Sequence, residues 1–160
     1  MDRNDELICE MIRENARFSY QEVGNAIGMS RVAAKKRIQK LEREGIIRGY
    51  NTCICREDEI TMLIDIVTAE GKMENVIEVL TSRMAYIRQI FRTTSGNHVH
   101  IVAVNENSAN LGYLLKMIKK ECKDDIVQMH YETVKEVIQD DYNRIKYEPK
   151  LKPDVAGKRG

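Results

Sequence analysis

Apolar side chains in the first third of the chain recur with the spacing of an α-helix. The residues from Asp2 to Asn15 place four of them on one stripe, namely Leu7, Ile8, Met11 and Ile12. Such a stripe predicts an amphipathic helix that packs along one side. Acidic residues in its first turn favour the positive end of the helix dipole.

Two further helices are expected next, separated by a short turn that contains glycine. Ser19-Tyr20-Gln21-Glu22 has the pattern of a capping box, which opens a helix that should end at Gly28. Ser30 is expected to cap a longer helix, which should run to about Glu44 and stop at Gly45. Two helices joined in this way form a helix-turn-helix. Residues 46–50 are expected to form a short strand, the start of a wing.

The longer helix divides into an apolar face, with Ala34, Ile38 and Leu41, and a basic face. The whole chain has 26 Lys+Arg and 25 Asp+Glu and a formal net charge of +1. Residues 31–48, however, hold seven basic and only two acidic side chains. Because a local field steers an anionic partner, this stretch favours double-stranded DNA as the partner over an ordinary solvated charged face.

Residues 60–138 alternate between strand-like and helix-like patterns. Strand-like runs occupy 60–69, 86–95, 98–105 and 126–138, and helical spacing occupies 72–84 and the residues that follow a capping serine, Ser108. The order is βαββαβ, the ferredoxin-like arrangement. The expected fold class is therefore α+β, with an N-terminal winged helix-turn-helix and a C-terminal ferredoxin-like domain.

Strands 60–69 and 98–105 are apolar on both faces. Strands of this kind are usually buried on both sides, whereas the two helices of this fold cover only one face of the sheet. We therefore expect the sheets of two subunits to pack against each other in at least a homodimer. A two-fold dimer also suits DNA binding, because it contacts two half-sites.

Four segments are expected: residues 1–50 as the DNA-binding domain, 51–59 as a linker, 60–138 as the second domain and 139–160 as a partly flexible tail. No apolar run approaches the roughly 18 residues of a membrane helix, and no signal-peptide pattern opens the chain. A cytoplasmic protein without a membrane partner is expected. The four cysteines are expected to be reduced thiols that pack as small hydrophobic residues: Cys9, Cys53, Cys55 and Cys122.

Four short motifs are distributed over residues 2–138. They are Asp2-x-x-Asp5 before Leu7-Ile8, Gly28-Met29-Ser30, Arg37-Ile38-x-x-Leu41-Glu42-x-x-Gly45-Ile46-Ile47-x-Gly49-Tyr50, and Ser95-Gly96-Asn97. In combination they resemble the Lrp/AsnC (feast/famine) family of bacterial and archaeal transcription regulators. The resemblance implies that residues 60–138 form an effector-sensing and oligomerisation domain of the RAM type. It also implies dimers that assemble further, commonly to octamers, and that respond to small effectors, often amino acids.

The helix pattern indicates where DNA would bind, and the resemblance implies where an effector would bind. DNA-binding residues are expected at the starts of the second and third helices and in the wing: Ser19, Tyr20, Ser30, Arg31, Val32, Lys35, Lys36, Arg37 and Arg48. The effector is expected near the glycine turn, at Ser95, Gly96, Asn97, His98 and His100. The family usually has an acidic residue shortly after this turn, but Asn97 and His100 stand there in this sequence. An amino-acid effector would therefore lack the expected carboxylates.

The histidines leave other interpretations open. His98 and His100 lie on the same side of one strand, where two imidazoles can share a metal ion or bond across an interface. Cys53 and Cys55 have the same spacing, but a polar strand end or hydrogen bonds between subunits explain the histidines as well, and we assign no metal site. An enzyme similar to the sirohaem decarboxylases of the tetrapyrrole pathway would use the same histidines, and a DNA-independent small-molecule sensor is a third possibility. Because no phosphate-binding loop or nucleophile motif is present, we expect no enzymatic activity, no catalytic residues and no cofactor.

Overall fold

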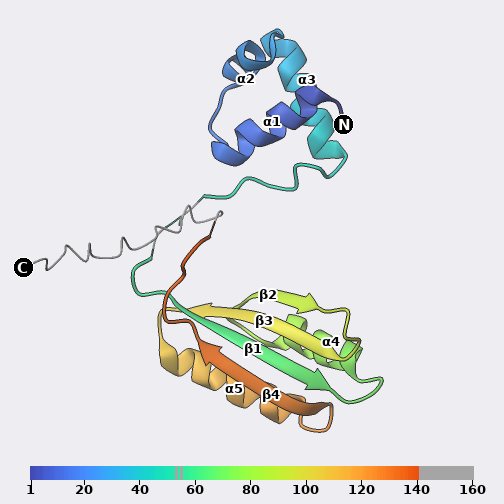
Figure 1. The fold of residues 1–160 in the computed structure, drawn as a ribbon, viewed down its shortest axis with the longest axis vertical. Coiled ribbons are helices and arrows are strands. Elements are labelled where there is room, and N and C mark those ends of the chain that lie inside the picture. The colour runs from blue at the N-terminus through green and yellow to red at the C-terminus, as the bar shows by residue number, and fades with distance from the viewer. Residues whose placement is uncertain (53, 55, 141–160) are drawn as a thin grey trace, which may run out of the picture. The chain divides into compact units, whose positions relative to one another are not determined.

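The computed structural model describes residues 1–52, 54 and 56–140. The chain forms two compact units, residues 1–53 and 54–160 (Figure 1). Cys53, Cys55 and the tail from residue 141 onward, which was expected to be partly flexible, lie outside the described residues. No helix in the described part of the chain is both long and apolar enough to cross a membrane.

The N-terminal unit contains the three predicted helices, α1 (Arg3–Glu14), α2 (Tyr20–Ile27) and α3 (Arg31–Arg43). Their boundaries follow the local signals in the sequence. The expected capping box at Ser19 is present, and Ser30 accepts a hydrogen bond from the backbone of Ala33. A second capping box, between Asp2 and Asp5, opens α1. The helices enclose a small core of five buried side chains: Ile8, Val23, Ala34, Ile38 and Leu41.

The turn between α2 and α3 depends on two glycines. Gly28 ends α2 with a φ of 70°, in the left-handed region that favours glycine. Gly24 has an ordinary helical position, but a Cβ there would lie only 2.7 Å from the backbone oxygen of Met29. The backbone of Met29 also donates a hydrogen bond of 2.8 Å to the Gly24 oxygen. The turn is therefore packed directly onto α2, with no space for a side chain between them.

Residues 46–50 do not form the predicted strand. After Gly45, the backbone amides of Ile46 and Ile47 both donate to the Leu41 oxygen, at 3.0 and 3.2 Å. The backbone NH groups of this segment thus find their hydrogen-bond acceptor at the end of α3, and Ile47 packs on the core of the unit. The β-branched residues favoured a strand locally, but no partner strand is present in the described part of this unit, so the prediction was wrong.

The second unit is a four-stranded antiparallel sheet with two helices on one face (Figure 1). Its elements are β1 (Ile60–Thr68), α4 (Met73–Arg83), β2 (Ile87–Arg92), β3 (His98–Asn105), α5 (Ser108–Glu121) and β4 (Ile126–Thr133). The spatial order is β2-β3-β1-β4. This order confirms the predicted βαββαβ arrangement and the α+β class.

Several boundaries differ from the expectation. The cap of α5 is Asn107 rather than Ser108, because the Asn107 side chain accepts from the backbone of Ala109 at 2.8 Å. Strand β2 is shorter than residues 86–95. Strand β4 ends at Thr133, since the last backbone bond of the ladder joins Val134 to Thr61 at the start of β1. Residues 135–138 follow this bond and form no strand.

The two faces of the sheet differ in their covering. Helices α4 and α5 bury the face that carries Ile64, Ile66 and Ile101. The opposite face, called here the helix-free face, carries Leu63 and Phe91, whose exposed fractions are 47% and 48%. Apolar side chains on both faces were predicted from the sequence. Burial of the helix-free face between two subunits stays a prediction.

Candidate nucleic-acid interface

Helix α3 presents one face to solvent and the other to the core of the N-terminal unit. The exposed side carries Arg31, Val32, Lys35, Lys36 and Gln39. Val32, in the first turn, has an exposed fraction of 63%. In the described part of the chain, no acidic side chain forms an ion pair with Arg31, Lys35 or Lys36. These cations are therefore available to an anionic partner.

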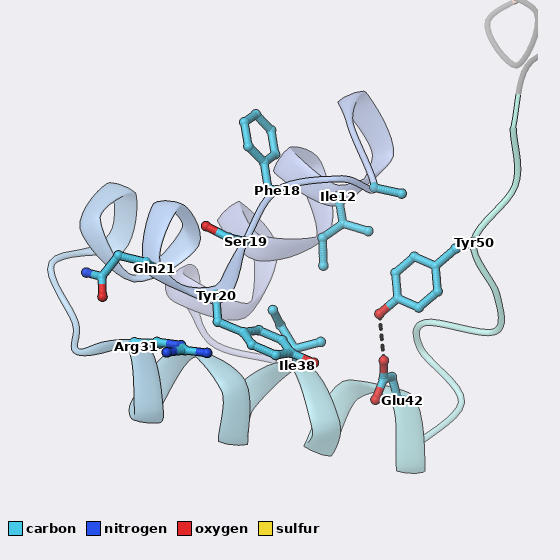
Figure 2. A pocket seen from close by; sticks show the side chains of 10 residues that line it. Ile12, Phe18, Ser19, Tyr20, Gln21, Arg31, Ile38, Glu42 and Tyr50 are labelled. Carbon is cyan, nitrogen blue, oxygen red and sulfur yellow. Dashed lines mark hydrogen bonds between the residues drawn. The ribbon is translucent and has the colours of Figure 1, made fainter.

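A pocket of about 490 Å³ lies beside this face, between the start of α2 and helix α3 (Figure 2). Tyr20 and Arg31 both line it, and the Tyr20 ring also contacts Lys35, whose Nζ lies 6.0 Å from the ring centroid. At the other end of the pocket the Tyr50 hydroxyl donates to Glu42 at 2.6 Å. Burial and the neighbouring Glu42 carboxylate raise the pKa of Tyr50 to about 12.

The two capping serines have hydroxyl groups that are only partly used. The Ser19 oxygen accepts from the Glu22 backbone, and the Ser30 oxygen accepts from the Ala33 backbone, both at 3.2 Å. A hydroxyl that accepts in this way still has its own proton to donate. At Ser19 the Glu22 carboxylate is a nearby acceptor, and the bonds from the Ser19 backbone and side chain lower the pKa of Glu22. Both serines are exposed and sit at helix N-termini, where backbone NH groups and the helix dipole favour an anion.

Arg37 does not face the same side as the other cations. Its guanidinium donates to both carboxylate oxygens of Asp2, at 2.9 and 2.7 Å, and to Asp5 at 2.7 Å. The side chain of Asp5 is only 4% exposed. The capping bond from Asp5 and the Arg37 guanidinium lower the pKa of Asp2. This arrangement joins α3 to α1 and engages the guanidinium within the unit. Contact of Arg37 with DNA stays a prediction, which these bonds disfavour.

Arg48 is exposed and lies in the segment after α3, where its Nε donates to the Gly45 oxygen at 3.3 Å. It keeps the expected position beside the end of the helix, although the segment is not a strand.

The predicted effector residues separate into two groups. Ser95, Gly96 and Asn97 form the turn between β2 and β3, in which Gly96 has a φ of 79°. The backbone carbonyl oxygen of Asn97 accepts hydrogen bonds from the backbone NH and from the hydroxyl of Thr68, at 2.8 and 3.2 Å. These bonds fix the turn to the end of β1. Nearby in the sequence, the Thr93 hydroxyl oxygen is buried and has no hydrogen-bond partner in the described part of the chain.

The histidines form the second group, together with a residue that sequence reasoning missed. His98 and His100 on β3 lie beside Asp65 on β1, with their Nδ1 atoms 3.5 and 3.3 Å from one Asp65 oxygen. The signal for Asp65 is the strand register, which places it directly opposite His100. His130 on β4 is also opposite Asp65, but its imidazole contacts Glu132 at 3.2 Å.

Comparisons with known proteins agree with this geometry. Residues 1–48 match the family described as winged helix-turn-helix DNA-binding. The HTH-type transcriptional regulator LrpA of Pyrococcus horikoshii is 30% identical over 106 residues, which cover 65% of this chain and 74% of that protein. The chain belongs to the Lrp/AsnC family. This Lrp/AsnC protein is accordingly a transcription regulator with a DNA-binding helix-turn-helix.

Two solved structures show that the fold extends over both units of this Lrp/AsnC regulator. AsnC of E. coli is 22% identical, with a TM-score of 0.73 over 86% of this chain and 93% of that chain. A transcriptional regulator from Neisseria meningitidis, solved as a complex with L-Met, is 15% identical, with a TM-score of 0.74 over 88% of this chain and 93% of that chain.

Proposed function

We propose that this regulator binds double-stranded DNA with the N-terminal half of α3 in the major groove. The observation that carries the proposal is the set of cations Arg31, Lys35 and Lys36, which have no ion-pair partner among the described residues and lie on the exposed face of a helix whose other face is buried. The first residues of such a helix are the ones that reach base edges.

The chemistry of each side chain suggests its role. Arg31 has the planar fork that can bond guanine at two positions, and Val32 offers methyl groups for contact with thymine. Lys35 and Lys36 are flexible point charges that suit phosphates. The remaining contacts would be to the DNA backbone, from Ser19, Tyr20, Ser30 and Arg48. We do not include Arg37, since its guanidinium is held by Asp2 and Asp5.

A double variant, Lys35→Ala/Lys36→Ala, tests the proposal. Each phosphate contact contributes a slope of about 0.9 to the dependence of log affinity on log salt concentration, so the loss of two contacts should reduce the slope by about two. The measurement is a salt series on genomic DNA fragments that the wild-type protein retains. The control variant is Lys119→Ala/Lys120→Ala, an exposed lysine pair on α5, which should leave the slope unchanged. Equal slopes for the first variant and wild type would refute the proposed interface.

We also propose that a small effector, with amino acids as the first class to test, binds at the turn formed by Ser95, Gly96 and Asn97, with His98 and His100 beside it. Two features support a ligand there: the turn is fixed to β1 through Thr68, and the buried Thr93 hydroxyl has no partner among the described residues. The L-Met complex of the Neisseria meningitidis regulator supports the amino-acid class. A regulator of this kind needs no catalytic step, and we propose none.

The effector proposal is tested by titrating single amino acids while DNA affinity is measured. An active amino acid should lose its effect in Asn97→Ala and in Thr93→Val, whereas DNA affinity without effector should be unchanged. If no amino acid changes DNA affinity or oligomer mass, the amino-acid class is refuted and the DNA-binding proposal is unaffected.

We propose further that residues 60–138 oligomerise, with the helix-free faces of two sheets packed together and the dimers assembling to a larger particle such as an octamer. Leu63 and Phe91 support this, because large apolar side chains exposed on a sheet face without helices are typical of interfaces. Leu63→Glu should reduce the mass measured by light scattering toward that of one chain. An unchanged mass would place the interface elsewhere.

A further inference from the structure

Three side chains on the helix-free face direct metal-ligating atoms toward one point. They are Asp65 on β1 and His98 and His100 on β3, and one ligand atom from each lies within 4.8 Å of the other two. In the described part of the chain, the Asp65 Oδ1 atom is shielded from solvent and has no hydrogen-bond partner. The histidine nitrogens at 3.3 and 3.5 Å are close to this oxygen without forming hydrogen bonds of acceptable geometry.

Removal of a carboxylate oxygen from water costs free energy unless a cation or a hydrogen-bond donor replaces the lost water. The Asp65 oxygen lies between two imidazole nitrogens, which are electron-pair donors when neutral. A cation between the three atoms would satisfy the oxygen and both nitrogens together. We propose that Asp65, His98 and His100 bind one divalent transition-metal ion of the Zn²⁺ class.

The separations of the atoms agree with such an ion. Zinc binds nitrogen and carboxylate oxygen at about 2.0–2.2 Å, so two ligands of a tetrahedral site lie about 3.4 Å apart. The two nitrogen–oxygen distances, 3.3 and 3.5 Å, are close to this value. The imidazole rings are nearly parallel, with an angle of 22° between their planes, so both rings approach the oxygen from the same strand in similar orientations.

The donor set selects among metals. Imidazole favours Zn²⁺, Ni²⁺, Cu²⁺ and Fe²⁺, whereas Ca²⁺ and Mg²⁺ prefer sites made of oxygen atoms alone. Three protein ligands leave one tetrahedral position for a further ligand, from water or from the opposing sheet of the proposed dimer.

The strand pairing makes the arrangement rigid. Asp65 is directly opposite His100 in the β1–β3 ladder, and His98 is two residues away on the same face. His130 is opposite Asp65 on the other side, but its imidazole is directed to Glu132. His130 therefore belongs to the same surface without belonging to the ligand set, and it provides a matched control.

The inference goes beyond the proposed amino-acid response and does not rest on it. Metal binding is measured on the full chain without DNA or amino acids. A protein that binds the metal and ignores amino acids, or the reverse, would separate the two proposals.

The experiment uses the full chain after removal of metals by chelation. Co²⁺ is added while the visible absorbance is recorded, and Zn²⁺ affinity is then measured by competition with a chromophoric chelator. We expect one ion per chain, with the intense visible bands of four-coordinate Co²⁺. His98→Ala, His100→Ala and Asp65→Asn should each weaken Zn²⁺ binding at least tenfold, since even the loss of a residue that only supports a ligand weakens binding by about 10- to 100-fold.

Two controls make the result specific. His130→Ala should leave the affinity within about twofold of wild type. Cys53→Ser/Cys55→Ser, which removes the pair of cysteines that has the same spacing as His98 and His100 in the sequence, should do the same. The proposal is overturned if no ion binds, if Asp65→Asn binds as wild type does, or if the controls lose affinity as much as the ligand variants. Melting curves without metal identify any variant that is unfolded, and Asp65→Asn, which conserves shape, decides the outcome if a histidine variant does not fold.

Discussion

Substitution of Gly24 by alanine sets two physical effects against each other. In an open helix interior the change is favourable by about 1 kcal/mol, because glycine has the larger conformational entropy in the unfolded chain. At Gly24, however, the new Cβ would lie 2.7 Å from the Met29 oxygen and 3.2 Å from the Ser30 carbonyl atoms. All of these are backbone atoms, so the turn has to move, and overpacking of this kind costs about 1–3 kcal/mol.

We therefore expect Gly24→Ala to lower the stability of the N-terminal unit by about 1 kcal/mol, which corresponds to roughly 4–8 °C in melting temperature for a unit of this size. DNA affinity should also fall, because the displaced turn carries the start of α3. The measurement is scanning calorimetry, with hydrogen exchange used to assign each transition to its unit.

Gly112 provides the matched comparison. It is an interior residue of α5, and a Cβ there would meet nothing within 4 Å. Gly112→Ala should therefore raise the stability of the second unit by about 0.5–1 kcal/mol. If Gly24→Ala stabilises its unit as Gly112→Ala does, the close approach between α2 and the turn does not exclude a Cβ at position 24, and the reasoning is refuted.

Three further predictions concern single side chains. Arg37→Met should lower the free energy of unfolding, measured in urea, by about 1–2 kcal/mol, because the buried Asp5 carboxylate loses its cation. If the variant instead shows a weaker dependence of DNA affinity on salt concentration, Arg37 contacts phosphate. Tyr50, whose pKa is about 12 beside Glu42, should ionise late in an ultraviolet titration, and its contribution to stability should be present below pH 10 and lost as the pH rises toward 12; a Tyr50→Phe variant that retains this late phase would contradict the assignment. Replacement of thymine by uracil at the base nearest Val32 should weaken binding by the wild type and have less effect on Val32→Ala, and equal losses would exclude a methyl contact.

The helices of the N-terminal unit could be predicted because their signals are local. A capping serine, a glutamate three residues later and a glycine at the end fix α2 within the sequence itself. The failed strand at residues 46–50 shows the limit of this reasoning. Strand propensity in Ile46 and Ile47 has no effect when no neighbouring strand pairs with them, and the end of α3 offers their amides an acceptor instead.

The candidate sites were only partly predictable, because they also depend on contacts between segments that are far apart in the sequence. Arg37 was expected to contact DNA together with Lys35 and Lys36, but its partners Asp2 and Asp5 lie at the start of a different helix. Asp65 was missed because its proximity to His98 and His100 depends on the register of two strands that are far apart in the sequence. Contacts between distant segments are set by tertiary packing, which hydrophobic spacing does not specify.

The division of α3 into two faces has a consequence for how such a regulator can diverge in evolution. The buried residues Ala34, Ile38 and Leu41 stabilise the unit, whereas the exposed side carries Arg31 and Val32 and contributes little to folding. Substitutions on the exposed side usually change stability by less than about 0.5 kcal/mol. A duplicated copy of this gene can therefore acquire a new operator preference through a few exposed positions while its fold is maintained.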